Sequence, residues 1–312
     1  MGRVVSMGEA LVEIMRKTVD SPLYAADDFV GPFPSGAPAI FIDQVARLGH
    51  DASFIGAVGA DDFGKCLLDR FRADDVDASY VAEVEGLATG CAFVTYFSDG
   101  ERQFIFHIGN SAAGQLPEIT AEMFEDADWL HICGSTLSAG EEMMQACYRA
   151  CGLAADAGAR ISFDPNLRPE LLGGEEALRR VCAPVVNAAS LILPSSTEAE
   201  LLTDTEDAHT ACRQLLERGA DVVALKRGSE GCTIFTDTDE VSVGAYNVDA
   251  VDPTGAGDSF DAACVVGLME DLSLQQIGRL ANACGALGAT KKGPMEGCAM
   301  RDDAFELAGL DQ

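Results

Sequence analysis

The sequence predicts an α/β protein with a mainly parallel central sheet and a small second sheet. From about residue 120 onward, short apolar runs of β type alternate with longer stretches whose apolar residues recur three and four positions apart. Two stretches in the first third interrupt this alternation and have the pattern of additional strands. The chain has 312 residues, 48% of them hydrophobic, which is enough to bury one large core. We therefore expect a single domain over residues 1–312.

Four strands are expected in the second half of the chain. They are WLHIC at residues 129–133, RISFD at 160–164, SLILP at 190–194 and DVVALK at 221–226. The segments between them have the helical period, and strand, helix and strand at this spacing imply right-handed crossovers with helices on both faces of a parallel sheet. Ligands bind to such sheets at the carboxyl ends of the strands. Chemistry is therefore expected where these runs end.

The first third combines the same pattern with two insertions. A strand in VVSMGEALVEIM precedes a helix in PAIFIDQVARLG, which Gly49 ends, and a strand in ASFIGAVG follows. Residues from about 12–34 are rich in Pro and Gly, and residues from about 87–108 have the pattern of a hairpin that turns at SDGE. Because the parallel pattern continues on either side, we expect both insertions to supply strands of a small lid rather than a separate domain.

Composition excludes several partners and locations. Asp and Glu number 51 against 21 Lys and Arg, a formal charge of −30, which argues against a nucleic acid or an anionic membrane as partner. The N-terminus has no basic segment followed by an uninterrupted apolar run, and no run of about 18 apolar residues occurs, so we expect a cytoplasmic protein. The eleven cysteines form no C-x-x-C pair, and many lie in apolar runs, as expected of reduced core residues.

The stretch DPTGAGDSF at residues 252–260 places two glycines and an acid in front of an apolar helical run. The small residues 255–257 leave room for backbone N–H groups to converge on an anion at the helix start. An ionised Asp258 beside such an anion hole can take a proton from an attacking hydroxyl. Taken alone, the stretch fits a plain helix start equally well. A Ser259 nucleophile is disfavoured, because it needs a His base and Gly-Asp-Ser hydrolases carry that His downstream, whereas all four histidines here lie upstream.

Two other elements have their own rationale. Asp164-Pro165-Asn166 ends a predicted buried strand, where polar residues face the ligand. A helix at 195–204 opens with Ser and Thr residues followed by Glu198, a pattern that is also typical of simple helix initiation. A glutamate beside a polyphosphate would need a cation between the two charges, which implies magnesium. The sequence has no Gly-x4-Gly-Lys-Ser/Thr loop, so it is not a P-loop enzyme.

The stretch from Asp252 to Asp258 resembles the C-terminal signature of the ribokinase-like (PfkB) carbohydrate kinases, and the likeness covers nearly the whole chain. The segments that carry it are PSGAPAIFIDQVARLGHDASFIGAVGADDFG, DPNLR, LPSSTEAELL, LKRGSEGC and NACGALGATKKGP. The resemblance implies a ribokinase-like three-layer sandwich, and it makes ATP, Mg²⁺ and a small sugar the ligands. It also suggests a second copy of the chain, paired through the lid, as the protein partner.

The same resemblance implies a role for individual residues. Asp258 would be the catalytic base, and the anion hole would consist of Gly255, Ala256 and Gly257. Sugar contacts are implied for Glu13, Gly36, Ala37, Phe106, Arg168 and Asp258. ATP contacts are implied for Lys226, Gly228, Gly231, Gly255, Gly257 and Asn282. Glu198 would organise Mg²⁺ through water, and Asp252 is a candidate ligand of a monovalent cation such as K⁺.

Departures from the family pattern bear on the sugar. Ile40 stands where an Asn usually binds hydroxyls, and Glu13 replaces the usual Asp, either bonding to the sugar or facing solvent. Kinases of 2-keto-3-deoxygluconate carry an Arg that pairs with the sugar carboxylate, and here that place is Ile108. A neutral ketohexose of the tagatose or fructose type is therefore expected. The alternative is 2-keto-3-deoxygluconate, with Arg168 or Arg102 as substitute, and the alternative of another class is a sensor that binds without turnover.

Overall fold

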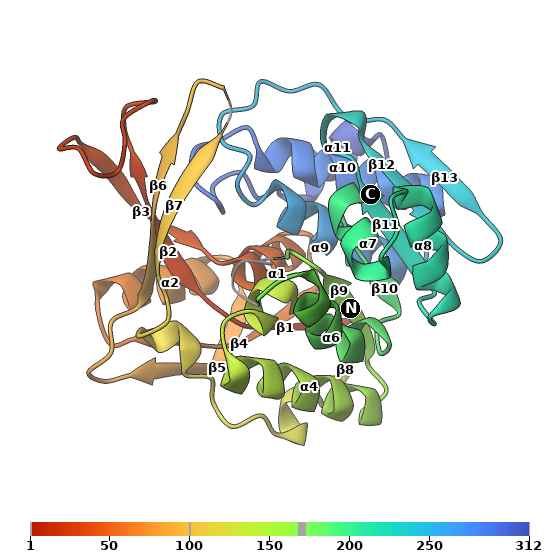
Figure 1. The fold of residues 1–312 in the computed structure, drawn as a ribbon, viewed down its shortest axis with the longest axis horizontal. Coiled ribbons are helices and arrows are strands. Elements are labelled where there is room, and N and C mark those ends of the chain that lie inside the picture. Colours follow the sequence, from red (N-terminus) through yellow and green to blue (C-terminus); the bar gives the residue numbers. More distant parts are fainter. Residues whose placement is uncertain (1, 100, 168–172, 312) are drawn as a thin grey trace.

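The computed structural model of the protein describes residues 2–99, 101–167 and 173–311. The strands in this part of the chain form two sheets, one of nine strands and one of four. Figure 1 shows the four-stranded sheet standing to one side of the body that the larger sheet and the helices form. The expected α/β fold with a mainly parallel sheet and a small second sheet is therefore confirmed.

The large sheet has the strand order β13-β12-β11-β10-β9-β8-β1-β4-β5. The strands are β1 (Arg3–Met7), β4 (Asp51–Gly59), β5 (Val76–Val84), β8 (Ala127–Cys133), β9 (Arg160–Asp164), β10 (Leu191–Ile192), β11 (Val222–Lys226), β12 (Cys232–Phe235) and β13 (Glu240–Val243). Pairing is parallel from β5 to β11 and antiparallel from β11 to β13. The four strands predicted in the second half are β8 to β11. The strands β5, β12 and β13 lie toward the sheet edges, and β5 and β13 are half exposed, which weakens their apolar pattern.

Helices cover both faces of this sheet. One face packs against α1 (Ala37–Arg47), α2 (Asp62–Ala73), α9 (Ala256–Met269), α10 (Leu274–Gly288) and α11 (Arg301–Ala308). The other packs against α3 (Gly134–Leu137), α4 (Glu141–Asp156), α6 (Glu175–Val186), α7 (Ser196–Thr203) and α8 (Ala208–Glu217). Neighbouring residues of a strand point to opposite faces, so Val4 of β1 belongs to the first core and Val5 to the second.

The small sheet has the order β3-β2-β6-β7, with β2 (Leu11–Arg16), β3 (Phe29–Ser35), β6 (Gly90–Tyr96) and β7 (Arg102–His107). These strands come from the two insertions recognised in the sequence. Residues opposite one another across strands share a face, and Glu13, Ala92 and Phe106 are paired in this way. Tyr96 and Arg102 form another pair, an even number of residues away, and so lie on the same face. We call this the inner face of the small sheet.

The cysteines are unpaired and mostly buried, as expected of reduced core residues. All eleven cysteines are free, nine of them buried and two half-buried. In the described part of the chain, none of the helices combines the length and apolar character needed to cross a bilayer.

Candidate active site

Polar residues meet where the parallel strands end, as expected for this fold. Asp164 is the last residue of β9 and Lys226 the last of β11. The Lys226 ammonium nitrogen lies 2.9 Å from Oδ1 of Asp164 and 3.0 Å from Oδ2 of Asp261 in α9. Burial acts to lower the pKa of Lys226, but the two carboxylates outweigh it, so the pKa is raised well above its ordinary value. The Lys226 ammonium group is therefore held in place at the carboxyl-terminal ends of the central strands.

The two glycines in residues 252–258, which we call the signature turn, have different roles. Gly255 caps α9 with φ +84°, and a Cβ there would lie 2.3 Å from the Pro294 carbonyl oxygen. Gly257 is exposed, and the nearest atom to a Cβ placed on it is Lys226 Nζ, at 4.0 Å. Gly255 thus allows close backbone packing, whereas Gly257 leaves open space beside a cation. Together with Ala256, which begins α9, these residues place helix N–H groups and positive potential where an anion can bind.

Asp258 lies in the first turn of α9 and is half-buried. Burial and the nearby Asp164 carboxylate raise its pKa to about 7. A carboxylate with this pKa can accept a proton near neutral pH. Ser259, in contrast, is fully buried, and its hydroxyl lies 3.8 Å from the Cys298 sulfur. The structure therefore gives Ser259 no access to a substrate, in line with the sequence argument against it.

Asp252 precedes this turn and is held from three directions. Its Oδ1 accepts hydrogen bonds from the Tyr96 hydroxyl at 2.7 Å and from the Thr254 N–H at 3.1 Å. Its Oδ2 accepts a hydrogen bond from the Gly293 N–H at 3.0 Å. Asp252 thereby joins the signature turn to the segment after α10 and to the small sheet. Tyr96 was not among the predicted site residues, because nothing in the local pattern around it points to a contact so far along the chain.

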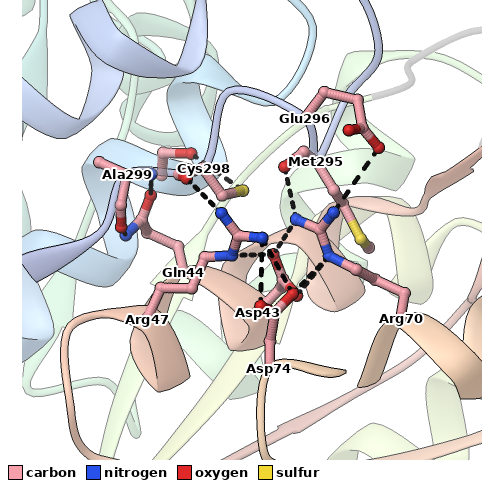
Figure 2. A network of polar contacts seen from close by, with 10 residues as sticks. Asp43, Gln44, Arg47, Arg70, Asp74, Met295, Glu296, Cys298 and Ala299 are labelled. Carbon is pink, nitrogen blue, oxygen red and sulfur yellow. Dashed lines mark hydrogen bonds and ion pairs between the residues drawn. The ribbon is translucent and has the colours of Figure 1, made fainter. Parts of the chain in front are cut away.

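A network of polar contacts holds residues 295–299, which directly follow Gly293 and Pro294 (Figure 2). Arg70 of α2 donates to both carboxylate oxygens of Asp43 in α1, at 3.0 and 2.8 Å, and to the Met295 carbonyl at 2.6 Å. The other links join Arg47 to Asp74 and to the Cys298 carbonyl, and Gln44 to the backbone of Ala299. We call this network the rear clamp. It fixes the segment that supplies the Gly293 N–H and the Pro294 carbonyl to the signature turn.

The inner face of the small sheet carries two of the expected sugar contacts. Glu13 is buried, not solvent-facing, and its Oε1 accepts a hydrogen bond from Ser35 at 2.8 Å. Burial raises the pKa of Glu13 to about 7. Its Oε2 has no hydrogen-bond partner in the described part of the chain. Phe106, two strands away across Ala92, is 51% exposed, so an acid and an accessible aromatic ring lie on the same face.

The backbone between the small sheet and α1 also comes close to the site. A Cβ on Gly36, whose φ is +110°, would lie 2.4 Å from the Glu9 carbonyl oxygen, and Ala37 begins α1 directly after it. Ile40, in the place where the family has Asn, is buried, and its Cγ2 would lie 3.2 Å from a Cβ on Gly255. Ile40 therefore packs under the signature turn and offers no hydrogen bond.

The remaining predicted residues have structural partners. Glu198 accepts hydrogen bonds from the N–H and hydroxyl of Ser195, both at 2.8 Å, and from the Leu167 N–H at 3.1 Å. Burial acts to raise the pKa of Glu198, but Lys226 and these donors outweigh it, so the pKa is lowered and the charge is kept.

Arg168, another predicted sugar contact, lies outside the described residues. No group of three or more His, Cys, Asp or Glu arranged for a metal occurs in residues 2–99, 101–167 and 173–311.

The residues expected at the nucleotide lie around the turn after β11. Gly228 and Gly231 both have positive φ, at +55° and +92°. A Cβ on Gly231 would lie 2.1 Å from the Val243 carbonyl oxygen, so this glycine allows the two backbones to meet. Asn282 of α10 donates to the same carbonyl and to that of Gly244, both at 3.1 Å. These residues shape the end of β13 beside α10.

Comparison with known proteins places this geometry in context. The family described as pfkB family carbohydrate kinase matches residues 1–300. The probable fructokinase-3 of Arabidopsis thaliana is 38% identical over 303 residues, covering 94% of this chain and 87% of that protein. Fructokinase-1 of Oryza sativa is 36% identical over 300 residues, covering 93% and 92%. A structure from E. coli, solved under the name ribokinase II in complex with ATP and Mg²⁺, is 37% identical, covers 99% of both chains and has a TM-score of 0.94.

Proposed function

Because the chain belongs to the pfkB family of carbohydrate kinases, we propose that it transfers the γ-phosphoryl group of ATP to a primary hydroxyl of a neutral ketohexose of the tagatose or fructose type. The observation that carries this proposal is the half-buried Asp258, with a pKa of about 7, directly after the open Gly257. Phosphoryl transfer to a hydroxyl needs a base and an anion hole side by side. The ketohexose assignment is supported by the relatives named fructokinase.

The chemical step follows from these positions. Asp258 accepts the proton of the sugar hydroxyl, and the hydroxyl oxygen bonds to the γ-phosphorus. The bond from that phosphorus to the bridging oxygen breaks, and ADP leaves. The N–H groups of residues 255–257 at the start of α9 stabilise the charge on the group in transfer. Lys226, whose ammonium nitrogen would lie 4.0 Å from a Cβ on Gly257, stays bound to its two carboxylate partners.

Nucleotide and cations would bind next to these groups. Gly228 and Gly231, on the turn after Lys226, and Asn282, in α10, would border ATP. Glu198 keeps its negative charge and would hold Mg²⁺ through water, and the metal when bound neutralises phosphate charge. Asp252, whose carboxylate is fixed by three donors, is our candidate ligand for K⁺.

The magnesium assignment has a direct test. Glu198→Gln should raise the Mg²⁺ concentration needed for half-maximal rate severalfold, because the amide carries no charge. Glu200→Gln in the same helix is the control. An unchanged Mg²⁺ dependence in the Glu198 variant would assign this residue to helix capping alone.

For the sugar, the proposal uses the inner face of the small sheet. Glu13 would accept a hydrogen bond from a sugar hydroxyl through Oε2, which has no partner among the described residues, and Phe106 would pack on the apolar side of the ring. Gly36 and Ala37 would approach the sugar through their backbone, and Asp258 would face the reacting hydroxyl. The small sheet would then act as a lid whose closure excludes water.

A screen for ADP release decides the substrate. Fructose, tagatose, ribose, 2-keto-3-deoxygluconate and a nucleoside are each supplied with ATP and Mg²⁺, and ³¹P NMR of the product identifies the phosphorylated hydroxyl. We expect turnover with a ketohexose. Turnover of the sugar acid alone would overturn the neutral-sugar assignment, and no ADP release with any compound would favour a binding protein without turnover.

One observation favours 2-keto-3-deoxygluconate as second candidate. Arg102 on the inner face is exposed and donates to the Thr254 hydroxyl at 3.0 Å, so a cation lies close to the signature turn. An Arg in this place can pair with a carboxylate. Arg102→Gln distinguishes the two cases, because it should abolish turnover of the acid while leaving a ketohexose reaction measurable.

We also propose a cytoplasmic location and a homodimer that forms through the small sheet. Strands β3 and β7 are its two edges, and Phe29 and Ile105 on them are 40% and 46% exposed. Unpaired edges with exposed apolar residues favour association. Light scattering of the purified protein should give twice the chain mass, and Ile105→Asp should give the monomer.

A further inference from the structure

The contact between Tyr96 and Asp252 links the small sheet to the signature turn. Tyr96 is the last residue of β6, and its hydroxyl donates to Asp252 Oδ1 at 2.7 Å. The same hydroxyl lies 3.2 Å from the Thr254 hydroxyl oxygen. Arg102, the cross-strand partner of Tyr96, donates to that Thr254 oxygen at 3.0 Å. Two neighbouring side chains of one sheet thus hold Asp252 and Thr254, which lead into Gly255.

The opposite side of the turn is held by the segment after α10. The second oxygen of Asp252 is bound to the Gly293 N–H, and the segment that follows Gly293 is held by the rear clamp. Figure 1 shows the chain between β13 and α9 passing beside the ends of β6 and β7 before it enters α9. Asp252 therefore has one oxygen tied to the body and the other to the small sheet.

Two properties make this link a coupling element rather than a local contact. The residues proposed to contact the sugar, Glu13 and Phe106, lie on the same inner face as Tyr96. Oδ1 of Asp252, which accepts the hydrogen bond from Tyr96, also accepts one from the Thr254 N–H within the signature turn. Tyr96 therefore helps to hold the oxygen on which the conformation of the turn depends. A sheet that is held by sugar would therefore hold the turn as well.

We propose that Tyr96 is a positioning residue for phosphoryl transfer. Its hydroxyl fixes the side chain of Asp252, and this contact holds the backbone N–H groups of residues 255–257 in place as an anion hole when the small sheet is closed over the sugar. The inference rests on the proposed sugar kinase activity. It predicts that the hole is completed only in the closed arrangement, which limits transfer to water when no sugar is bound.

The test compares Tyr96→Phe with Tyr148→Phe. Tyr148 is also partly buried and donates to the Val181 carbonyl between α4 and α6, away from the site. Loss of the Tyr96 hydroxyl should lower kcat about tenfold, as expected for a hydrogen bond to a charged group, with little change in the KM for ATP. The ratio of sugar-dependent to sugar-free ATP hydrolysis should fall. Tyr148→Phe should leave both quantities unchanged.

The link to the turn is tested by a double-mutant cycle with Asp252→Ala. The effect of Tyr96→Phe on kcat should be smaller in the Asp252→Ala background, because either change alone removes the hydrogen bond between the two side chains. Additive effects, an unchanged kcat, or a loss of active protein with kcat per active site unchanged would each overturn the proposal. Failure of the kinase assignment is distinguishable, because the unaltered protein would then release no ADP with any sugar.

Discussion

Lys226 at the end of β11 and Asp261 in α9 form a buried ion pair, with Nζ 3.0 Å from Oδ2. The pair attaches the first turns of α9 to the edge of the central sheet. Asp258 lies three residues before Asp261, on the same side of the helix, so the pair also sets where the proposed base is placed. The base, the open glycine and the fixed cation are therefore one structural unit.

Asp258→Asn should lower kcat by about a thousandfold or more, because an amide cannot accept the proton of the sugar hydroxyl. ATP binding, measured by isothermal titration calorimetry, should stay close to that of the unaltered protein. Asp303→Asn on the exposed face of α11 is the control and should have no effect on the rate. A near-normal rate for the Asp258 variant would remove the base assignment.

The rate should depend on pH in the neutral range. The base acts in its deprotonated form, and burial together with Asp164 raises the pKa of Asp258 to about 7. We expect kcat/KM to rise with pH up to about this value and to level off above it, with a fall of about tenfold per pH unit on the acid side. A rate profile measured from pH 5 to 9 checks this. A profile that is flat between pH 5 and 8 would show that the base has the pKa of an ordinary carboxyl.

Alanine at the two signature glycines should have different consequences. Gly255→Ala places a Cβ 2.3 Å from the Pro294 carbonyl at positive φ, so the melting temperature should fall together with activity. In the described part of the chain, and apart from the adjoining backbone of α9, the atom nearest to the Cβ of Gly257→Ala is Lys226 Nζ, at 4.0 Å. It should leave the melting temperature nearly unchanged but lower kcat, because the methyl group occupies the anion site. Equal thermal stability of the two variants would contradict this division of roles.

Removing the central cation of the rear clamp should be costly. Arg70→Met leaves Asp43, which is fully buried, without its bidentate partner and should lower the free energy of unfolding by about 3 kcal/mol. Lys65→Met on the same helix removes an exposed ion pair with Asp69 and should change it by less than about 0.5 kcal/mol. Urea unfolding measures both.

The rear clamp also has a local readout. Amide hydrogen exchange in the Arg70 variant should become faster at residues 293–299, because the Met295 carbonyl loses the guanidinium that anchors it. Unfolding free energies that are equal in the two variants, or exchange that is accelerated uniformly over the chain, would show that the clamp does not hold this segment.

Sequence reasoning recovered the parts of the fold that have a local pattern. Strands β8 to β11 are apolar runs followed by helical periodicity, and the signature turn combines small residues with an acid in consecutive positions. The long interior strands could therefore be predicted. β5 and β13 were missed because both are half exposed, and β12 was missed because it has only four residues. The two insertions were recognised by their Pro, Gly and hairpin signals.

The contacts that organise the site could not be predicted in the same way. Tyr96 and Asp252 are 156 residues apart, and the contact between Arg70 and Met295 spans 225 residues. Residues so far apart form no pattern that can be recognised in the sequence, because only the folded chain brings them together. The family resemblance implied that Lys226 contacts ATP, but the carboxylates that hold it come from two other elements. Asp261 had one detectable signal, an acid inside an apolar helical run.

Several arginine side chains of this protein are buried, and their burial affects the charge balance of the surface. Arg47 and Arg70 in the rear clamp are 17% and 12% exposed, and Arg16 is almost fully buried while it donates to carbonyls of the loop between β2 and β3. With a formal charge of −30, a chain that places arginines inside has even fewer cations to separate its surface carboxylates. Their mutual repulsion weakens the folded state and is reduced by dissolved ions. The protein should therefore become more stable as ionic strength rises, opposite to what a surface rich in ion pairs would show.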